Sequence, residues 1–319
     1  MSNHLRLGSP IEATKAIKNP TEREGIRNCA VRDGVARVKH LSWLEEKLNR
    51  NEFVNETQSA DSLENFQKQE DFFQTLSFDS ISAFGANGAI IHYSPKAETA
   101  AQIKRDGIYL LDAGAQYLDC TTDVTRTHVF GSANDEQKKA YTLVLQGSID
   151  LASAIFPEGT YGRHIDILAR GALYKNFMDY NHGTGHGIGH YLSVHEGPSS
   201  ISMGYSSSAL PLTEGMLFSD EPGYYKPHDF GIRLETDIMV ESYTLPVNYV
   251  NTTTKFLHFE IVTWVPFERN LIECSMLSED QKTWLNAYHS TVRTKLEATN
   301  RLNSVELNYL RDQTREINC

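Results

Sequence analysis

The sequence places acidic side chains in segments that otherwise read as buried β-strands, and this feature constrains the fold more than any other. Asp112 closes the apolar run 107–114, and Asp123 stands in the β-branched segment 121–130. Burying a lone carboxylate costs on the order of several kcal/mol unless the group is paired or bound to a cation. The spacing of Asp112 and Asp123 suits two strands joined by a turn, with their carboxylates meeting between them.

Two further acidic positions show the same pattern. Glu221 follows the predicted strand 216–220 and precedes a Pro-Gly turn. Glu235 ends the run Gly-Ile-Arg-Leu-Glu, and Arg233, two residues earlier, shares its face of a strand. Taken singly, each of these acidic groups also fits a strand-end turn, an acidic loop or an ion pair across a strand face. Together they predict one shared site.

A glycine-rich run at 181–190 carries three histidines, His182, His186 and His190. Glycine alternates with other residues there, which disfavours a regular helix. The alternation indicates a backbone held close to another backbone or to a ligand. His195 follows soon after, where a histidine taken alone is more often an ordinary polar residue.

These groups form a donor set dominated by hard oxygen, which is typical of Mn(II), Co(II), Fe(II) or Zn(II) and wrong for Cu(I). One ion would leave two or more buried carboxylates uncompensated, whereas two bridged ions balance the charge. Two such ions, about 3.5–4 Å apart, can activate one water. The predicted metal ligands are Asp112, Asp123, His186, Glu221 and Glu235.

Composition excludes several other classes of protein. The formal net charge is -11, which argues against a nucleic-acid binder. No run approaches the roughly 18 apolar residues of a membrane-spanning helix, and the first 15 residues lack the apolar core of a secretory signal. We therefore expect neither nucleic acid nor membrane among the partners.

The cysteines are scattered, with no CxxC spacing. This argues against a disulfide framework or a thiolate zinc site, and it favours a reducing cytoplasm. The four are Cys29, Cys120, Cys274 and Cys319.

Hydrophobic periodicity predicts an α+β fold. Helices are predicted at 21–50, 59–72, 135–156, 164–178 and 278–299, with a weaker helix after the last. Strands are predicted at 89–93, 107–114, 121–130, 216–220, 232–240 and 256–265. The predicted division is an irregular segment at 1–19, a catalytic domain at 20–266 and a C-terminal helical extension at 267–319.

The five ligand motifs occur in the order found in a known family. They are the DAG turn at 112–114, TDVTRT at 122–127, HGTGHG at 182–187, DEPGYY at 220–225 and GIRLET at 231–236. With them the chain resembles the pita-bread metallopeptidases, which include methionine aminopeptidase, prolidase and aminopeptidase P. The segments GAIIHYSP at 88–95 and VHEGP at 194–198 are most similar to the catalytic part of the cytosolic Xaa-Pro aminopeptidase branch.

The resemblance implies a fold and a set of roles. The pita-bread fold is a curved mixed or antiparallel sheet flanked by helices, with a dinuclear metal site in its concave face. The implied ions are Mn(II), or alternatively Zn(II) or Co(II), and the implied substrate is a peptide with proline in second position. A homodimer is also implied. The implied catalytic residues are His92, His182, His195 and Glu221, and the residues expected around ligands and substrate are Arg233, Tyr93 and Thr125.

Alternatives stay open at this point. One is a prolidase-type dipeptidase; another is a module that binds metal but serves only protein interaction. Relatives carry one or two additional N-terminal domains, and they usually have Asn where this chain has Thr236.

Overall fold

The protein is described here by a computed structural model covering residues 9–246 and 253–319. Capped amphipathic segments form its helices. The α-helices are α1 (Pro10–Ala16), α2 (Pro20–Asn49), α3 (Glu56–Gln67), α4 (Asp135–Ala152), α5 (Gly162–Tyr174), α6 (Glu279–Ala298) and α7 (Ser304–Gln313). The 3-10 helices are η1 (Gly85–Ala89), η3 (Arg269–Leu271) and η4 (Cys274–Met276). All the predicted helices are present, the second of them shifted toward the N-terminus. No described helix is both long enough and apolar enough to traverse a bilayer.

Short strands make up several small sheets, and every pairing between the strands named here is antiparallel. The strands are β1 (Phe73–Leu76), β2 (Ile81–Phe84), β3 (Tyr109–Ala113), β4 (Ala115–Tyr117), β5 (Cys120–Thr121), β6 (Val124–His128), β7 (Ile155–Pro157), β8 (Gly185–His186), β9 (Ser200–Ile201), β10 (Leu217–Asp220), β11 (Gly223–Lys226), β12 (Phe230–Arg233), β13 (Thr236–Tyr243) and β14 (Phe256–Ile261). The strand orders are β1-β4-β5, β2-β3-β6, β8-β9, β11-β12 and β10-β13-β14-β7.

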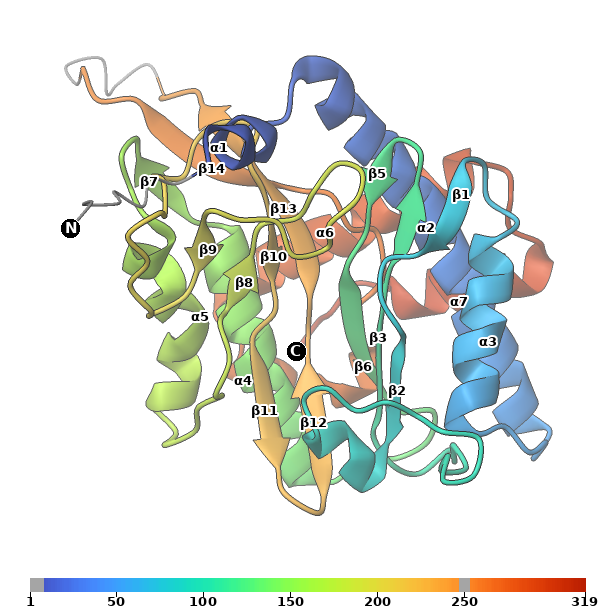
Figure 1. Ribbon diagram of the computed structural model, residues 1–319. Helices are drawn as coiled ribbons and strands as arrows, with labels where there is room; N and C mark the ends of the chain where they lie inside the picture. The colour runs from blue at the N-terminus through green and yellow to red at the C-terminus, as the bar shows by residue number, and fades with distance from the viewer. Residues whose placement is uncertain (1–8, 247–252) are drawn as a thin grey trace, which may run out of the picture.

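The sheets lie side by side in the middle of the molecule, with helices around them (Figure 1). Strands β12 and β13 contact β6, which joins the sheet β2-β3-β6 to the sheet that contains β10 and β13. Helices α4 and α6 lie behind the strands in this view, α5 lies on one side, and α2 and α3 lie on the other. One large apolar cluster fills the space between the strands and helices α2, α4 and α6.

Two buried arginines tie the strands of the site to the surrounding helices. Arg37 of α2 pairs with Asp33 and donates to the carbonyl of Ala113, at the end of β3. Arg126 of β6 donates to the carbonyl of Glu235 at 2.6 Å and to the hydroxyl of Tyr288 at 3.0 Å. Arg126 is only 2% exposed, so the C-terminal helices are fastened directly behind the site.

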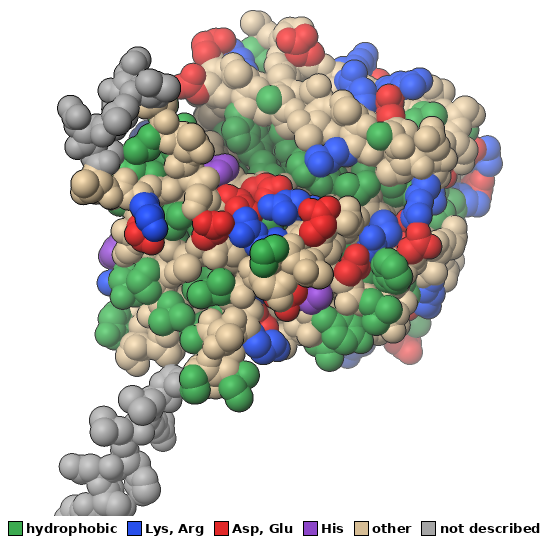
Figure 2. Space-filling model, turned by 90° about the horizontal axis from the view of Figure 1, so that it is seen from above, with side chains coloured by type: hydrophobic (Ala, Val, Ile, Leu, Met, Phe, Trp, Pro, Cys, Tyr) green, Lys and Arg blue, Asp and Glu red, His purple; other side chains and the backbone are tan. Residues whose placement is uncertain are grey.

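Ion pairs hold the start of α2 against the outer strands. Arg23 pairs with Glu241, and Arg27 donates to both carboxylate oxygens of Glu260, to Oε1 at 2.9 Å and to Oε2 at 2.7 Å. On the face seen from above, Lys and Arg side chains are interspersed with Asp and Glu and form no extended basic patch (Figure 2). The pairs of Arg23 and Arg27 are partly buried, and ion pairs within reach of solvent contribute little stability individually, about 0–1 kcal/mol.

Three local predictions are wrong. The strand at 89–93 does not form, because its apolar residues border a cavity instead of pairing; Ile90 is 54% exposed. The strand at 232–240 is split into β12 and β13, because the amide of Glu235 bonds the carbonyl of Thr125 at 3.0 Å. The segment 1–19 is not wholly irregular, since it contains α1, capped by Ser9; residues 1–8 lie outside the described part of the chain.

The cysteines also differ from expectation. The structure joins Cys29 to Cys120 and Cys274 to Cys319, over sequence separations of 91 and 45 residues. The prediction of no disulfide framework is therefore wrong. Sequence spacing misses these pairs because the fold brings distant segments together: α2 meets β5, and η4 meets residue 319.

Free-thiol titration tests this pairing. Protein purified without reductant and then denatured should show no reactive thiol, because every cysteine is paired. After reduction, all four cysteines should react. Four reactive thiols before reduction would refute both disulfides.

A second prediction concerns the close approach of η1 to β12. A Cβ added at Gly231 would collide with the backbone oxygen of Gly88, whereas one added at Gly171 of α5 meets nothing within 4 Å. Gly231→Ala should therefore destabilise the protein by at least about 2–3 kcal/mol, because two backbones must separate. Gly171→Ala should be neutral or stabilising by about 0.5–1 kcal/mol. Urea unfolding measures both, and equal stabilities for the two variants would contradict the packing described here.

Candidate metal centre

A cavity of about 540 Å³ opens between the sheets and gathers nearly all the predicted site residues. Of the eleven residues predicted for the site, only Thr125 does not line it. The predicted residues in its wall are His92, Tyr93, Asp112, Asp123, His182, His186, His195, Glu221, Arg233 and Glu235. Apolar lining that sequence reasoning did not single out comes from Phe78, Ile81, Ile91 and Val194.

The carboxylates converge from different strands. Asp112 belongs to β3 and Asp123 precedes β6, and the two strands pair directly with Asp112 opposite Thr125. Glu221 follows β10, and Glu235 lies between β12 and β13. The predicted meeting of Asp112 and Asp123 is confirmed, with the additional hairpin of β4 and β5 between them.

The donor atoms fall into overlapping groups. Within each group they lie within 4.8 Å of one another. One group is Asp112, Asp123 and Glu235; a second is His186, Glu221 and Glu235. Glu235 is common to both, as a carboxylate that bridges two centres would be.

His186 is oriented by its own backbone neighbourhood. Its Nδ1 lies 3.0 Å from the carbonyl of Gly187, so Nδ1 donates and Nε2 is left facing the carboxylates. Nε2 lies 3.3 Å from Asp123 Oδ2 and 3.5 Å from Glu221 Oε1. The glycines of the predicted run allow this strand to pack closely, since a Cβ at Gly185 would collide with the carbonyl of Ser219.

Burial and mutual repulsion shift the acidity of the cluster. Burial raises the pKa of Asp123 to about 6 and that of Glu221 to about 7. Burial, followed by the charges of Asp123 and Asp112, raises the pKa of Glu235 well above its usual range. Burial alone would lower the pKa of His186, but its hydrogen bond to Asp123 and the nearby carboxylates raise it to about 9. The cavity thus concentrates negative charge that strongly favours a cation.

Among the residues that the structure describes, Arg233 supplies the one guanidinium in the cavity wall. Its Nη2 donates to Asp112 Oδ2 at 2.7 Å and its Nε to Thr125 Oγ1 at 3.2 Å. Thr125 Oγ1 in turn donates to Glu235 Oε2 at 2.7 Å. Arg233 and Thr125 therefore orient carboxylates, in line with their predicted place around the ligands.

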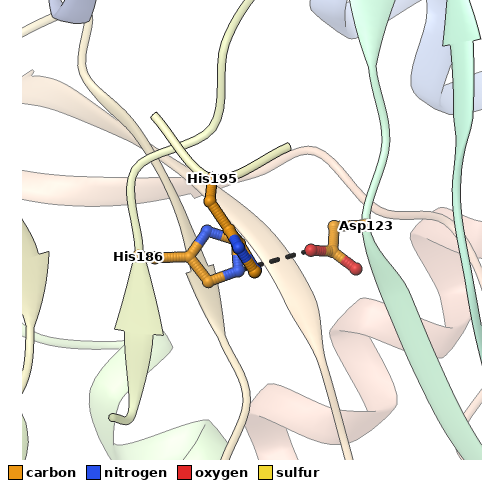
Figure 3. A group of neighbouring side chains, drawn as sticks. All are labelled: Asp123, His186 and His195. Atoms are coloured by element: carbon orange, nitrogen blue, oxygen red, sulfur yellow. Dashed lines mark ion pairs between the residues drawn. The ribbon is translucent and has the colours of Figure 1, made fainter. Parts of the chain in front are cut away.

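The three remaining histidines occupy different parts of the cavity. The ring of His195 lies 4.2 Å from that of His186, and both rings stand beside Asp123 (Figure 3). His195 also falls in a third donor group with Asp123 and His186, which sequence reasoning did not foresee. His92 lines the opening. Both ring nitrogens of His182 have partners, the carbonyl of Gly183 at 2.8 Å and the hydroxyl of Tyr225 at 2.9 Å.

Tyr225 is a site residue that sequence reasoning quoted in a motif without giving it a role. Its hydroxyl accepts from Arg233 Nη1 at 2.9 Å and lies at the same distance from His182 Nε2. The signal was available in the alternation of β11, because Gly223 and Tyr225 fall on the same side of the chain as Glu221.

The residues present fit divalent cations. In the described part of the chain, four carboxylates converge beside the guanidinium of Arg233 and the imidazole of His186, and Asp112 Oδ1 is buried without a hydrogen-bond partner there. Carboxylate oxygens with a single imidazole are donors typical of Mn(II), Zn(II) or Co(II). Two divalent ions would offset the charge that the chain itself leaves uncompensated.

Comparison with known proteins agrees with this picture. Residues 24–242 match the model of metallopeptidase family M24, and residues 255–317 match the C-terminal region of the same family. The chain belongs to metallopeptidase family M24. Its α+β pita-bread fold, predicted from the motifs, is confirmed.

Curated proteins similar to this chain carry the name aminopeptidase P. The chain is 48% identical over 309 residues to a probable Xaa-Pro aminopeptidase P of Laccaria bicolor, covering 97% of this chain and 48% of that protein. It is 45% identical to aminopeptidase P1 of Lotus japonicus, over 91% of this chain and 46% of that protein. The chain spans about half the length of the curated relatives it matches.

Among solved structures, an X-prolyl aminopeptidase is more similar to this chain than a prolidase is. An X-prolyl aminopeptidase of Caenorhabditis elegans, described as a cytosolic enzyme with a di-nuclear active site, has a TM-score of 0.91 and 38% identity. The matched region covers 97% of this chain and 50% of the Caenorhabditis elegans chain. The prolidase of Pyrococcus furiosus has a TM-score of 0.58 and 27% identity, over 72% of this chain and 64% of its own.

One ion pair behind the site gives a stability prediction. Lys18, 3% exposed, binds Glu196 Oε1 at 2.9 Å, next to His195, and the exposed Lys15 lies 3.4 Å from the other oxygen. Lys18→Met should cost up to about 3–5 kcal/mol, because a buried carboxylate loses its main partner. Lys15→Met should cost at most about 1 kcal/mol.

Urea unfolding of both single variants and of Lys18→Met/Glu196→Gln is the measurement. The double variant should recover part of the loss, since the orphaned charge is gone. A Lys18→Met variant no less stable than Lys15→Met would refute the pair.

Proposed function

We propose that this chain is the catalytic part of an Xaa-Pro aminopeptidase, which hydrolyses the bond between the first residue of a peptide and a proline in second position. The observation that carries the proposal is the pair of donor groups sharing Glu235 inside a cavity that also presents three further histidines. The printed names of the relatives at 45–48% identity support the specificity for proline.

The proposed metal ligands are those of the sequence analysis. Asp112, Asp123 and Glu235 would hold one ion, and His186, Glu221 and Glu235 the other. When bound, two divalent cations would supply Lewis acidity toward the substrate carbonyl and lower the pKa of a water molecule. Mn(II) is the proposed metal, and the donor set also admits Zn(II) and Co(II).

The chain's own groups would then guide the proton and the substrate. Glu221 would take the proton of the attacking water and deliver it to the proline nitrogen as that nitrogen leaves. His195 would donate a hydrogen bond to the carbonyl oxygen as negative charge develops there. The hydroxyl of Tyr225 would keep His182 turned toward the substrate.

Proline needs a pocket of its own because it lacks an N–H and has a fixed φ. His92 and Tyr93, with the apolar side chains of Ile81 and Ile91, form the wall proposed to receive its ring.

Other features of the proposal rest on the resemblance. The catalytic domain at 20–266, the C-terminal extension at 267–319 and a homodimer are proposed on that ground. Location in the cytoplasm is likewise proposed; the related Caenorhabditis elegans enzyme is described as cytosolic. Disulfides are more typical of oxidising compartments, so the thiol titration above also bears on location.

The experiment uses an Arg-Pro-Pro peptide with metal-stripped protein, before and after addition of Mn(II). We expect release of the first residue only with metal, because the carboxylate cluster needs cations to act on the carbonyl. Cleavage of an Xaa-Pro dipeptide, measured in parallel, distinguishes an aminopeptidase from a prolidase, because a prolidase would prefer the dipeptide to the longer peptide. No cleavage despite two bound ions would favour a binding module.

Two variants complete this test. Asp123→Asn should bind less metal and should also lose activity, because the substitution removes a charged ligand atom that belongs to two of the donor groups. His195→Ala should keep both ions, measured by metal analysis, and should lose about 10²–10³-fold in kcat as expected for an oxyanion donor. Unchanged turnover in His195→Ala would refute the role given to His195.

A further inference from the structure

We propose that Glu56, which lies outside the cavity, is a positioning residue that fixes the loop carrying His92 and Tyr93 into the cavity wall. The role of Glu56 in substrate binding rests on the proposed function, whereas its role in holding the loop does not. The loop in question is the segment 84–101, which begins at the last residue of β2, contains η1 and is otherwise without helix or strand.

Glu56 binds both ends and the middle of this loop. Its Oε1 accepts from the amide of Phe84 at 2.7 Å and from Asn87 Nδ2 at 2.9 Å. Its Oε2 accepts from the hydroxyl of Tyr93 and the amide of Ala101, both at 2.8 Å. Its own amide donates to the carbonyl of Ala101 at 3.1 Å. A single residue therefore closes a loop of eighteen positions.

The carboxylate is fully buried, at 0% exposure, and no Lys or Arg of the described residues forms an ion pair with it. Four donors and the first turn of α3 stabilise the charge instead. All four donors belong to the loop 84–101, so removal of this carboxylate would leave buried donors of the loop unpaired.

The first half of the loop also packs through η1 against β12, and the amide of Gly85 donates to the carbonyl of Ile108 at 2.8 Å, whereas the half that carries His92 is largely exposed. His92 is exposed at the cavity mouth, and Ile90 is 54% exposed. Tyr93 contacts the small cluster of Ile81, Ala83 and Leu110, and its hydroxyl also accepts from Asn87 Nδ2 at 2.9 Å. Glu56 thus joins this contact to the backbone at Phe84 and Ala101, so the position of His92 follows from the carboxylate.

The substitution Glu56→Gln tests this directly. The amides of Phe84 and Ala101 bind different carboxylate oxygens, so in either orientation a glutamine amide sets its NH2 against one backbone N–H. The matched control is Glu268→Gln. Glu268 is also buried, at 2% exposure, and accepts a hydrogen bond from the backbone amide of Asn270 at 3.0 Å, but its described partners all lie outside the loop 84–101.

Hydrogen exchange of the full chain is the first measurement. In Glu56→Gln, amides of 84–101 should exchange at least about tenfold faster than in the parent, while the strands of the cavity stay protected. Glu268→Gln should leave exchange in this loop unchanged. Unchanged loop protection in Glu56→Gln, or an equal effect of Glu268→Gln, would overturn the proposal.

The kinetic arm uses the Arg-Pro-Pro peptide with Mn(II). For Glu56→Gln, kcat/KM should fall about tenfold or more, chiefly through KM, with two bound metal ions retained, because the loop shapes the substrate wall and supplies no ligand. If the parent protein cleaves nothing, the proposed function fails while the exchange experiment still decides the role of Glu56. If Glu56→Gln does not fold, the pair Asn87→Ala/Tyr93→Phe removes two of the four donors, and unchanged loop exchange there would equally overturn the proposal.

Discussion

The burial of four carboxylates in one cavity is the constraint on which the rest of this structure depends. Asp112, Asp123 and Glu235 are each less than 10% exposed, and Glu221 joins them at the end of β10. Like charges so close together repel strongly in a medium of low dielectric constant. A bound cation, fixed hydrogen-bond donors or protonation can each relieve this repulsion, and the raised pKa values of Asp123 and Glu221 reflect it.

The surrounding chain holds this charge in place through buried cations and backbone contacts. Arg233 binds Asp112, Arg126 binds the carbonyl of Glu235, and Arg37 binds the carbonyl after Asp112. These three arginines come from a strand of the hairpin, a strand of the sheet and the long helix α2. Removing any of them would leave buried acceptors unpaired, so the frame of the site and the core of the protein are stabilised by the same interactions.

A second group of contacts shapes the cavity and leaves the ligands untouched. Glu56 fastens the loop of His92, Lys18 fastens the loop of His195 through Glu196, and Tyr225 fastens His182. Each of these three histidines of the cavity wall is therefore held, directly or through its loop, by a residue that is distant in sequence. Glu56 and Lys18 make no described contact with the four carboxylates, whereas Tyr225 is linked to Asp112 through Arg233.

The sequence by itself predicted that these acidic side chains belong to one site, because a carboxylate at the end of an apolar strand, such as Asp112, is costly to bury without a partner. It also predicted the long helices, whose periodicity and caps are local. Tertiary structure alone decided what depends on distant chain segments: the pairing of Cys29 with Cys120, the unpaired course of 89–93 along the cavity, and the closure of that loop by Glu56. Local sequence patterns do not predict which distant segments come into contact, because those contacts depend on the packing of the whole chain.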